Sequence, residues 1–177
     1  AELWKARQFR DVDVQATLRE LIDGERLVLL RDDKGRLYGA TRELFEKEQE
    51  IARLTVDGRH DTGHRTDAVL TRRVVDDFAT ASRAKAEREG WRFDERIWTK
   101  QRTAIESLTT ETGRIAVLKG FAGAGKTTAM TCVRQVYEAS GFTVIGCAVA
   151  GRAAENLERE AGIKSDTLLG LLTRIEH

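Results

Sequence analysis

Apolar positions in the first third of the chain follow helical spacing, then strand spacing, then helical spacing again. Between Asp13 and Gly24 the apolar residues recur on one face of a helix, which Asp13 can cap and Gly24 can end. Residues 27–31 and 36–40 predict two strands, because a turn-forming Asp-Asp-Lys-Gly sequence separates them. Thr41 is a plausible cap for a second helix. The order helix, hairpin, helix predicts a small winged-helix-like module.

The middle of the chain is first polar and then strongly helical. The stretch from Thr55 to Arg65 is rich in Gly, Asp and His, so we expect a loop there. Residues 66–89 predict one long helix that Gly90 ends. Its basic residues alternate with acids, which favours a solvated outer face over a DNA-binding patch. The expected inward-facing residues are Leu70, Val74, Phe78 and Ala81.

From residue 94 onward, short apolar runs alternate with helical segments. A helix over 99–108 precedes a short apolar strand over 115–118. A helix over 126–140 and a strand over 143–150 come next, which together predict a βαβ crossover in a parallel α/β sheet. Two further helices are expected over 153–160 and 167–175.

These patterns divide the chain into three parts. Residues 1–54 form the expected helix–hairpin–helix module, residues 55–93 a loop with a connecting helix, and residues 94–177 the beginning of an α/β domain. The chain opens with Ala1 and not with Met, so we expect it to be a piece of a longer protein.

Composition and charge narrow the range of functions. The 177 residues are 41% apolar and 33% charged, which is typical of a soluble globular protein. Lys and Arg number 30 against 29 Asp and Glu, so no global field attracts nucleic acid and any DNA contact must be local. No apolar run approaches the roughly 18 residues of a membrane span, and no signal peptide is visible. We therefore expect a cytoplasmic protein with no membrane partner.

The cysteine and histidine residues do not predict a redox-active pair or a metal site. Cys132 and Cys147 stand in apolar stretches without a Cys-x-x-Cys spacing, which predicts two buried thiols in a reducing compartment. His60 and His64 are four residues apart, but their segment does not look helical and has no Cys or carboxylate pair nearby. Solvated loop histidines are therefore a better interpretation than a zinc site.

The strongest motif is glycine-rich. From Gly120 to Thr127 the sequence matches the pattern Gly-x-x-x-x-Gly-Lys-Thr, between the predicted strand and the predicted helix. Such a loop turns successive backbone N–H groups toward phosphate oxygens, and the helix N-terminus adds partial positive charge. Lys126 and Thr127 are the candidate catalytic residues, because the ammonium reaches phosphates and the hydroxyl can bind Mg²⁺. The expected phosphate-binding residues are Gly120, Phe121, Ala122, Gly123, Ala124, Gly125, Lys126, Thr127 and Thr128.

Several segments resemble motifs of RecD-like superfamily 1 helicases. Residues 98–105 look like the adenine-recognising glutamine motif, and residues 120–128 resemble the first helicase motif. Residues 148–157 are similar to motif Ia, and residues 167–172 to the next DNA-facing motif. The Ala-Gly-Arg-Ala-Ala-Glu-Asn-Leu combination is most similar to the helicase region of conjugative-transfer relaxase–helicases. The resemblance covers about residues 95–177.

This resemblance implies a partial RecA-like P-loop NTPase sheet that uses ATP and Mg²⁺. Gln101 would hold the adenine edge, while Lys126 and Thr127 would hold the phosphates and Mg²⁺. The DNA backbone would lie against Gly151, Arg152 and Thr167. A solvent-exposed arginine next to a helix start is an equally good interpretation of Arg152. The implied partners are single-stranded DNA and the rest of the same polypeptide, with a second RecA-like domain and possibly a nicking domain.

The chain also departs from the family pattern. No Asp-Glu pair follows an apolar strand after the P-loop, and no arginine finger of a second motor domain is present. The histidine cluster and tyrosine of a nicking domain are not found either. We therefore expect this fragment to bind nucleotide and to hydrolyse it poorly, since transition-state charge would go uncompensated.

Three rival functions remain. A small P-loop kinase carries its P-loop near its start, whereas here about a hundred residues come first. A GTPase would need Asn-Lys-x-Asp after the P-loop, and none follows. A non-catalytic DNA- or protein-interaction module with a vestigial P-loop is the third alternative.

Overall fold

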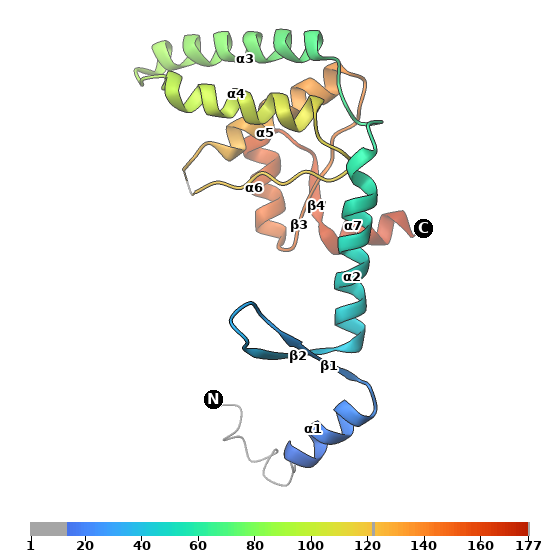
Figure 1. Ribbon diagram of the computed structural model, residues 1–177. Coiled ribbons are helices and arrows are strands. Elements are labelled where there is room, and N and C mark those ends of the chain that lie inside the picture. The colour runs from blue at the N-terminus through green and yellow to red at the C-terminus, as the bar shows by residue number, and fades with distance from the viewer. Residues whose placement is uncertain (1–13, 122, 177) are drawn as a thin grey trace. The chain divides into compact units, whose positions relative to one another are not determined.

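The computed structural model describes residues 14–121 and 123–176, and the chain divides into two compact units, Ala1–Asp57 and Gly58–His177. Within the described residues no helix is long and apolar enough to cross a lipid bilayer. The first unit contains α1 (Val14–Asp23), β1 (Leu27–Arg31), β2 (Leu37–Thr41) and α2 (Arg42–Asp57) (Figure 1). The second contains a 3₁₀ turn (Gly58–His60), α3 (Ala68–Glu89), α4 (Glu95–Thr110), α5 (Lys126–Ala139), β3 (Gly146–Ala148), α6 (Gly151–Ala161), β4 (Ser165–Thr167) and α7 (Leu168–Ile175).

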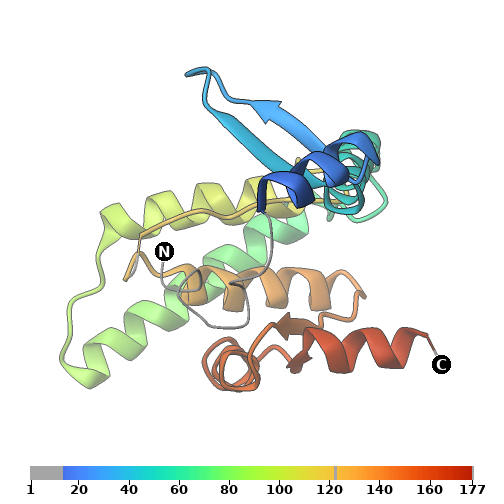
Figure 2. The ribbon, with the colours of Figure 1, turned by 90° about the horizontal axis from the view of Figure 1, so that it is seen from below.

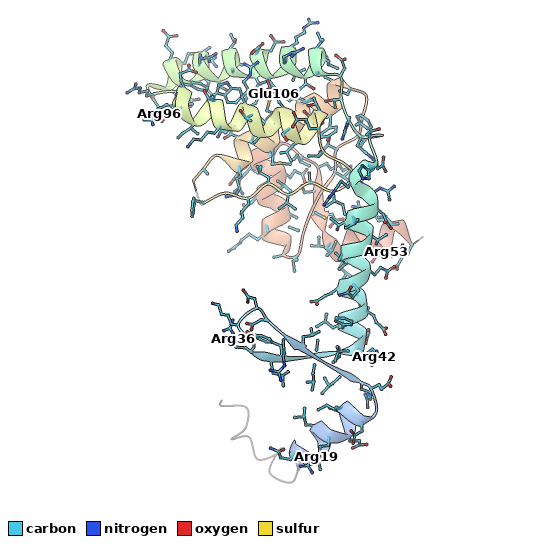
Figure 3. All side chains as sticks on the ribbon, in the orientation of Figure 1. Arg19, Arg36, Arg42, Arg53, Arg96 and Glu106 are labelled. Atoms are coloured by element: carbon cyan, nitrogen blue, oxygen red, sulfur yellow. The ribbon has the colours of Figure 1, made fainter. Side chains whose placement is uncertain are left out.

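In the N-terminal unit, β1 and β2 form an antiparallel hairpin. Asp32 closes its turn, because one carboxylate oxygen accepts the backbone N–H groups of Lys34 and Arg36 at 3.0 and 2.8 Å. Gly35 adopts a positive φ of 76°, which a residue with a side chain rarely does. Charged side chains such as those of Arg36 and Arg53 extend from the hairpin and from α2 into solvent (Figure 3).

The N-terminal unit has no buried core of its own over the residues whose exposure is known. None of residues 15–57 is buried. Large apolar side chains are exposed on every element, and they are Leu18, Leu29, Leu37, Tyr38, Leu44, Ile51, Leu54 and Val56. A two-stranded hairpin is marginally stable by itself in water. The unit therefore derives little stability from packing within its described residues.

The core of the C-terminal unit lies between α3, α4 and α5. Val75 from α3, Ile105 from α4 and Val136 from α5 are fully buried together. Trp98 completes this core, stacked on Phe78 with ring centroids 5.7 Å apart. Polar side chains and one glycine fix the ends of these helices. Asp67 and Asp94 accept hydrogen bonds from the first turns of α3 and α4, and Gly90 ends α3 with a φ of 73°.

The inward face predicted for α3 is centred one residue away from the observed one. Leu70, Val74 and Phe78 are half-buried, and Val74 and Phe78 pack against the core, but Ala81 is exposed. The buried positions of α3 are Thr71, Val75, Ala79 and Ala86. The helix α3 packs against α4 and α5 at the same time. Its buried residues therefore lie between the side that faces α4 and the side that faces α5, where small side chains allow the three helices to approach closely. The Thr71 hydroxyl is satisfied there by a hydrogen bond of 2.7 Å to the Thr66 hydroxyl.

The strand expected before the glycine-rich loop is not formed. Residues 115–118 are extended, but across the described residues no backbone hydrogen bond joins them to a neighbour, and Val117 is 84% exposed. A strand exists only when another strand pairs with it. The strand predicted over 143–150 is likewise shortened to β3. It pairs in parallel with β4, which was not predicted, so the βαβ crossover is β3–α6–β4 and lies one helix later than expected.

Two further sequence expectations need correction. The polar stretch 55–65 is not all loop, since α2 continues to Asp57 and a 3₁₀ turn follows. The residue that follows this stretch is fixed to α4, because the backbone N–H of Thr66 donates a hydrogen bond of 2.8 Å to the carbonyl oxygen of Thr109. Cys132 is buried as predicted, but Cys147 in β3 is exposed. Alternate residues of a strand face opposite sides, and α6 covers only the side that carries Gly146 and Ala148.

Candidate functional site

The glycine-rich loop curls immediately before α5. Gly123 and Gly125 have φ values of 76° and 72°, in the left-handed region that glycine adopts without strain. Gly125 is the N-cap of α5, and no side chain caps this helix. The first N–H groups of α5 are therefore open to an external acceptor, as in an anion-binding helix start. Ala122, also expected to contribute, lies outside the described residues.

Lys126 folds back over the loop from the first turn of α5. Its ammonium donates to the carbonyl oxygens of Gly120 and Phe121, both at 2.8 Å. The Lys126 side chain thus spans the open side of the loop, while Phe121 itself is 91% exposed. A bound anion would be attracted to the same ammonium. The structure brings together the loop and the cation as the sequence predicted.

Gln101 reaches the loop from α4. Its side-chain amide donates to the carbonyl oxygens of Ala124 and Gly125 at 3.3 and 3.2 Å. A Cβ atom on Gly125 would displace the end of the Gln101 side chain, and the positive φ of Gly125 also favours glycine at this position. The two segments are 24 residues apart in sequence, and helix packing makes them neighbours.

A pocket of about 340 Å³ lies between α4 and the glycine-rich loop. Its floor combines the loop with an apolar patch, to which Ile97 and Leu118 contribute. Ile97, Gln101 and Ala104 share one face of α4, at intervals of four and three residues. Of these three residues only Gln101 is predicted from the sequence to contact a ligand, although the same helical spacing also indicates Ile97 and Ala104. Lys100, Lys119 and Lys126 also line the pocket. A pocket that combines apolar side chains, one amide and cations suits a planar, hydrogen-bonding ring that carries phosphates.

Two ion pairs hold α4 in place against α3. Arg102 donates to Asp76 at 2.6 Å and to Glu106 at 2.9 Å. Arg83 makes two hydrogen bonds to Glu95, of 2.7 and 2.9 Å. The hydrogen bond that Arg102 donates to Asp76 raises the pKa of the Arg102 guanidinium above its ordinary value, so the group stays charged. These contacts fix the helix that carries Gln101.

Thr127 and Thr128 lie in the first turn of α5, on the side away from the Gln101 pocket. Both line a second, larger groove of about 950 Å³ between α3, α5 and α6. Thr127 is half-buried and Thr128 is exposed. Across the described residues, no group of three or more His, Cys, Asp or Glu side chains is placed to hold a metal ion.

Gly151, Arg152 and Thr167, the residues expected to face DNA, meet at one end of the small sheet. β3 and β4 are parallel with Ala148 opposite Thr167, so α6 and α7 start from the same edge. The Thr167 hydroxyl accepts the N–H of Gly170 at 3.0 Å and caps α7. Arg152 is exposed and makes no ion pair with any described residue. The helix start at Gly151 has no side-chain cap, which leaves N–H groups available.

One protein family matches the C-terminal part of the chain. Residues 96–177 match the family described as AAA domain. This part of the chain is similar to RecD-like helicases. The matched residues, called the AAA domain below after that description, include the glycine-rich loop, Gln101 and the edge at Gly151 and Thr167. The resemblance inferred from the sequence motifs is thereby confirmed.

The similar curated proteins are conjugal transfer proteins. Conjugal transfer protein TraA of Rhizobium radiobacter is 50% identical over 78 residues, which are 44% of this chain and 7% of that protein. Probable conjugal transfer protein TraA of Sinorhizobium fredii is 53% identical over 73 residues, 41% of this chain and 6% of that protein. The chain thus matches less than a tenth of the length of these relatives. No solved structure matches the chain.

Proposed function

We propose that the AAA domain binds ATP with Mg²⁺ and is the nucleotide-binding part of a DNA helicase or translocase in a conjugative-transfer protein. The observation that carries this proposal is the convergence of three groups. The uncapped start of α5, the Lys126 ammonium and the Gln101 amide surround one loop. Backbone N–H groups and an ammonium suit phosphates, and the amide suits a base.

The residues present fit a nucleoside triphosphate with its metal. The N–H groups at the start of α5 and Lys126 would hold the phosphate tail, and the Thr127 hydroxyl would be a ligand of Mg²⁺. When bound, Mg²⁺ neutralises charge on the phosphate oxygens. Lys126 would exchange its contacts with the Gly120 and Phe121 carbonyls for phosphate oxygens. We expect hydrolysis by this chain alone to be slow, because it offers no Asp-Glu pair after the loop.

For DNA, we propose that Gly151, Arg152 and Thr167 contact the backbone of a single strand. Helix N-termini and arginines are the groups that commonly bind phosphates in protein–DNA interfaces. The meeting of α6 and α7 at one edge supports this proposal. Residues 1–54 are proposed to be a separate winged-helix-like module, a proposal supported by the order of α1, the hairpin and α2.

Equilibrium binding of fluorescently labelled ATP to the purified chain tests the nucleotide proposal. We expect saturable, Mg²⁺-dependent binding that Lys126→Ala weakens strongly. Lys119→Ala is a matched control, because Lys119 also lines the pocket but is not in the loop motif. If the parent chain binds no nucleotide, the loop is a structural remnant and the chain is an interaction module.

A further inference from the structure

The larger groove carries cations that the sequence motifs do not include. It runs between α3, the first turns of α5 and the end of α6, with a volume of about 950 Å³. Thr127 and Thr128 line it from the side of the glycine-rich loop. Lys85 and Arg88 of α3, with Trp91 just after the helix, line it from the other side. The groove is separate from the pocket at Gln101, with which it shares no residue.

The directions of the helices place these cations beyond the start of α5. Gln101 of α4 donates a hydrogen bond to Gly125, just before α5. Further along both helices, the Tyr137 hydroxyl near the end of α5 donates to the carbonyl of Leu108 in α4. The two helices therefore run in parallel. The pairs Asp76–Arg102 and Arg83–Glu95 show that α3 runs antiparallel to both. The last turns of α3 therefore extend past the first turn of α5, as both views of the ribbon show (Figures 1 and 2). This is the end of α5 at which an anion would bind.

This extension of α3 is held firmly. Glu95 binds the Arg83 guanidinium through two hydrogen bonds, and the same guanidinium lies 5.1 Å from the centre of the Phe93 ring. Glu89 accepts the indole N–H of Trp91 at 3.1 Å and lies 4.0 Å from the Lys85 ammonium. The wall of the groove is thus a fixed surface and not a free helix end.

Arg88 differs from the other cations of this wall. It makes no ion pair or side-chain hydrogen bond within the described part of the chain, whereas Arg83 is fully engaged and Lys85 is near Glu89. Two carboxylates also line the groove, Asp77 and Glu160. Asp77 precedes Arg88 by eleven residues, roughly 16 Å along a helix, so it does not neutralise the guanidinium. Glu160 lies 3.5 Å from the Arg159 guanidinium, and no ion pair joins it to Arg88. Within the described part of the chain the Arg88 guanidinium is thus an unpaired cation with several N–H donors in one plane, and such a group binds phosphate oxygens well.

We propose that Arg88, assisted by Lys85, contacts the outermost phosphate of a nucleoside triphosphate held by the glycine-rich loop. The same chain that carries the loop would then also supply a cation that makes it bind a nucleoside triphosphate more tightly than a diphosphate. This proposal rests on nucleotide binding at the loop, the function proposed above. It adds residues of α3, outside every motif in the sequence, to the binding site.

Comparing ATP and ADP affinities of the full chain tests this role. Labelled ATP and labelled ADP are titrated, with Mg²⁺, into the parent, Arg88→Ala and Arg88→Lys. Arg72→Ala is the matched control, because Arg72 is an exposed arginine of the same helix that does not line the groove. We expect Arg88→Ala to lower the ATP-over-ADP affinity ratio about threefold to tenfold, since the contact is partly open to solvent. Arg88→Lys keeps part of the preference, and Arg72→Ala keeps all of it.

The possible results separate this inference from the function on which it rests. If ADP and ATP bind the parent but Arg88→Ala leaves their ratio unchanged, Arg88 is not a phosphate ligand although the loop binds nucleotide. If Arg72→Ala lowers the ratio equally, the effect comes from the overall positive charge of α3 and not from a contact of Arg88, and the inference is wrong. If the parent binds neither nucleotide, both proposals fail. Circular dichroism confirms that each variant is folded.

Discussion

The Gln101 side chain donates a hydrogen bond of 3.2 Å to the carbonyl oxygen of Gly125, the N-cap residue immediately before α5. This contact joins the helix of the expected base-binding pocket to the loop of the expected phosphate site. A base bound at Gln101 and a phosphate bound at the loop would therefore contact two groups that are hydrogen-bonded to each other. Substitutions at either residue should affect both parts of nucleotide recognition.

Gly125→Ala should impair nucleotide binding more than Gly123→Ala does. Both positions have positive φ, so alanine costs about 1–2 kcal/mol of backbone strain at each. Only at Gly125 does the new Cβ also collide with Gln101, because open space surrounds Gly123. Chemical denaturation and labelled-ATP binding measure the two effects. The double variant Gly125→Ala with Gln101→Ala should recover part of the lost stability, and no recovery would contradict the collision.

Gln101→Ala should reduce the preference of the chain for ATP over GTP. The side-chain amide is the one group on the α4 side of the pocket that can both donate and accept a hydrogen bond, so its loss removes the contact that distinguishes the two bases. Competition of unlabelled ATP and GTP against labelled ATP measures the ratio. Lys100→Ala is the matched control, since Lys100 is the neighbouring pocket residue on α4. An unchanged ratio in Gln101→Ala would remove Gln101 from base recognition.

Arg152→Ala should weaken single-stranded DNA binding and make it less dependent on salt. Loss of one phosphate contact lowers the slope of log affinity against log salt by roughly 0.7 for a single strand. Fluorescence anisotropy at several salt concentrations measures both quantities. Arg159→Ala is a suitable control, because Arg159 lies on the same helix but near its end and is paired with Asn156. Equal effects of the two substitutions would contradict a specific DNA contact at the start of α6.

The two cysteines should differ sharply in reactivity. Cys147 is exposed, whereas Cys132 is fully buried between the helices, and burial raises the pKa of its thiol to about 12. A thiol-specific reagent at about pH 8 should therefore label one site rapidly and the second only after unfolding. Mass spectrometry locates the label, with Cys147→Ser as the control. Rapid labelling of Cys132 would show that the three-helix core opens readily.

The same thiol should make stability fall at high pH. In the unfolded chain Cys132 ionises near its ordinary pKa of 9.0, while in the folded protein it stays neutral up to about 12. Its contribution is complete below pH 9 and is lost between pH 9 and 12, at up to about 1.4 kcal/mol per pH unit. Urea unfolding of the parent and of Cys132→Ala at several pH values isolates this term. Parallel stability curves for the two proteins would contradict it.

Local sequence signals predicted most helices of the C-terminal unit because their physical causes are local. Asp94 and Gly90 act as helix caps within a few residues of their partners, and the glycine-rich motif is contiguous. The strand over 115–118 failed for the opposite reason, since pairing depends on a distant partner. β4 escaped notice because Ser165, Asp166 and Thr167 carry no apolar pattern.

The candidate site shows the same division. Lys126 and Thr127 could be named from the motif, but the contact of Gln101 with Gly125 depends on how α4 packs on α5. Sequence spacing placed Gln101 25 residues before Lys126 and could not show that the two segments touch. Arg88 was treated as part of a solvated helix face, because nothing local reveals that α3 extends past α5. Packing of whole helices decides such positions.

Backbone amide NMR during titration with Mg²⁺ and ATP shows whether the glycine-rich loop binds the nucleotide. We expect the amide signals of Gly123, Gly125, Lys126 and Thr127 to shift together and to saturate with one dissociation constant, and we expect Lys126→Ala to abolish the response. Shifts confined to other parts of the chain, or no shifts at all, would contradict a phosphate cradle at the start of α5.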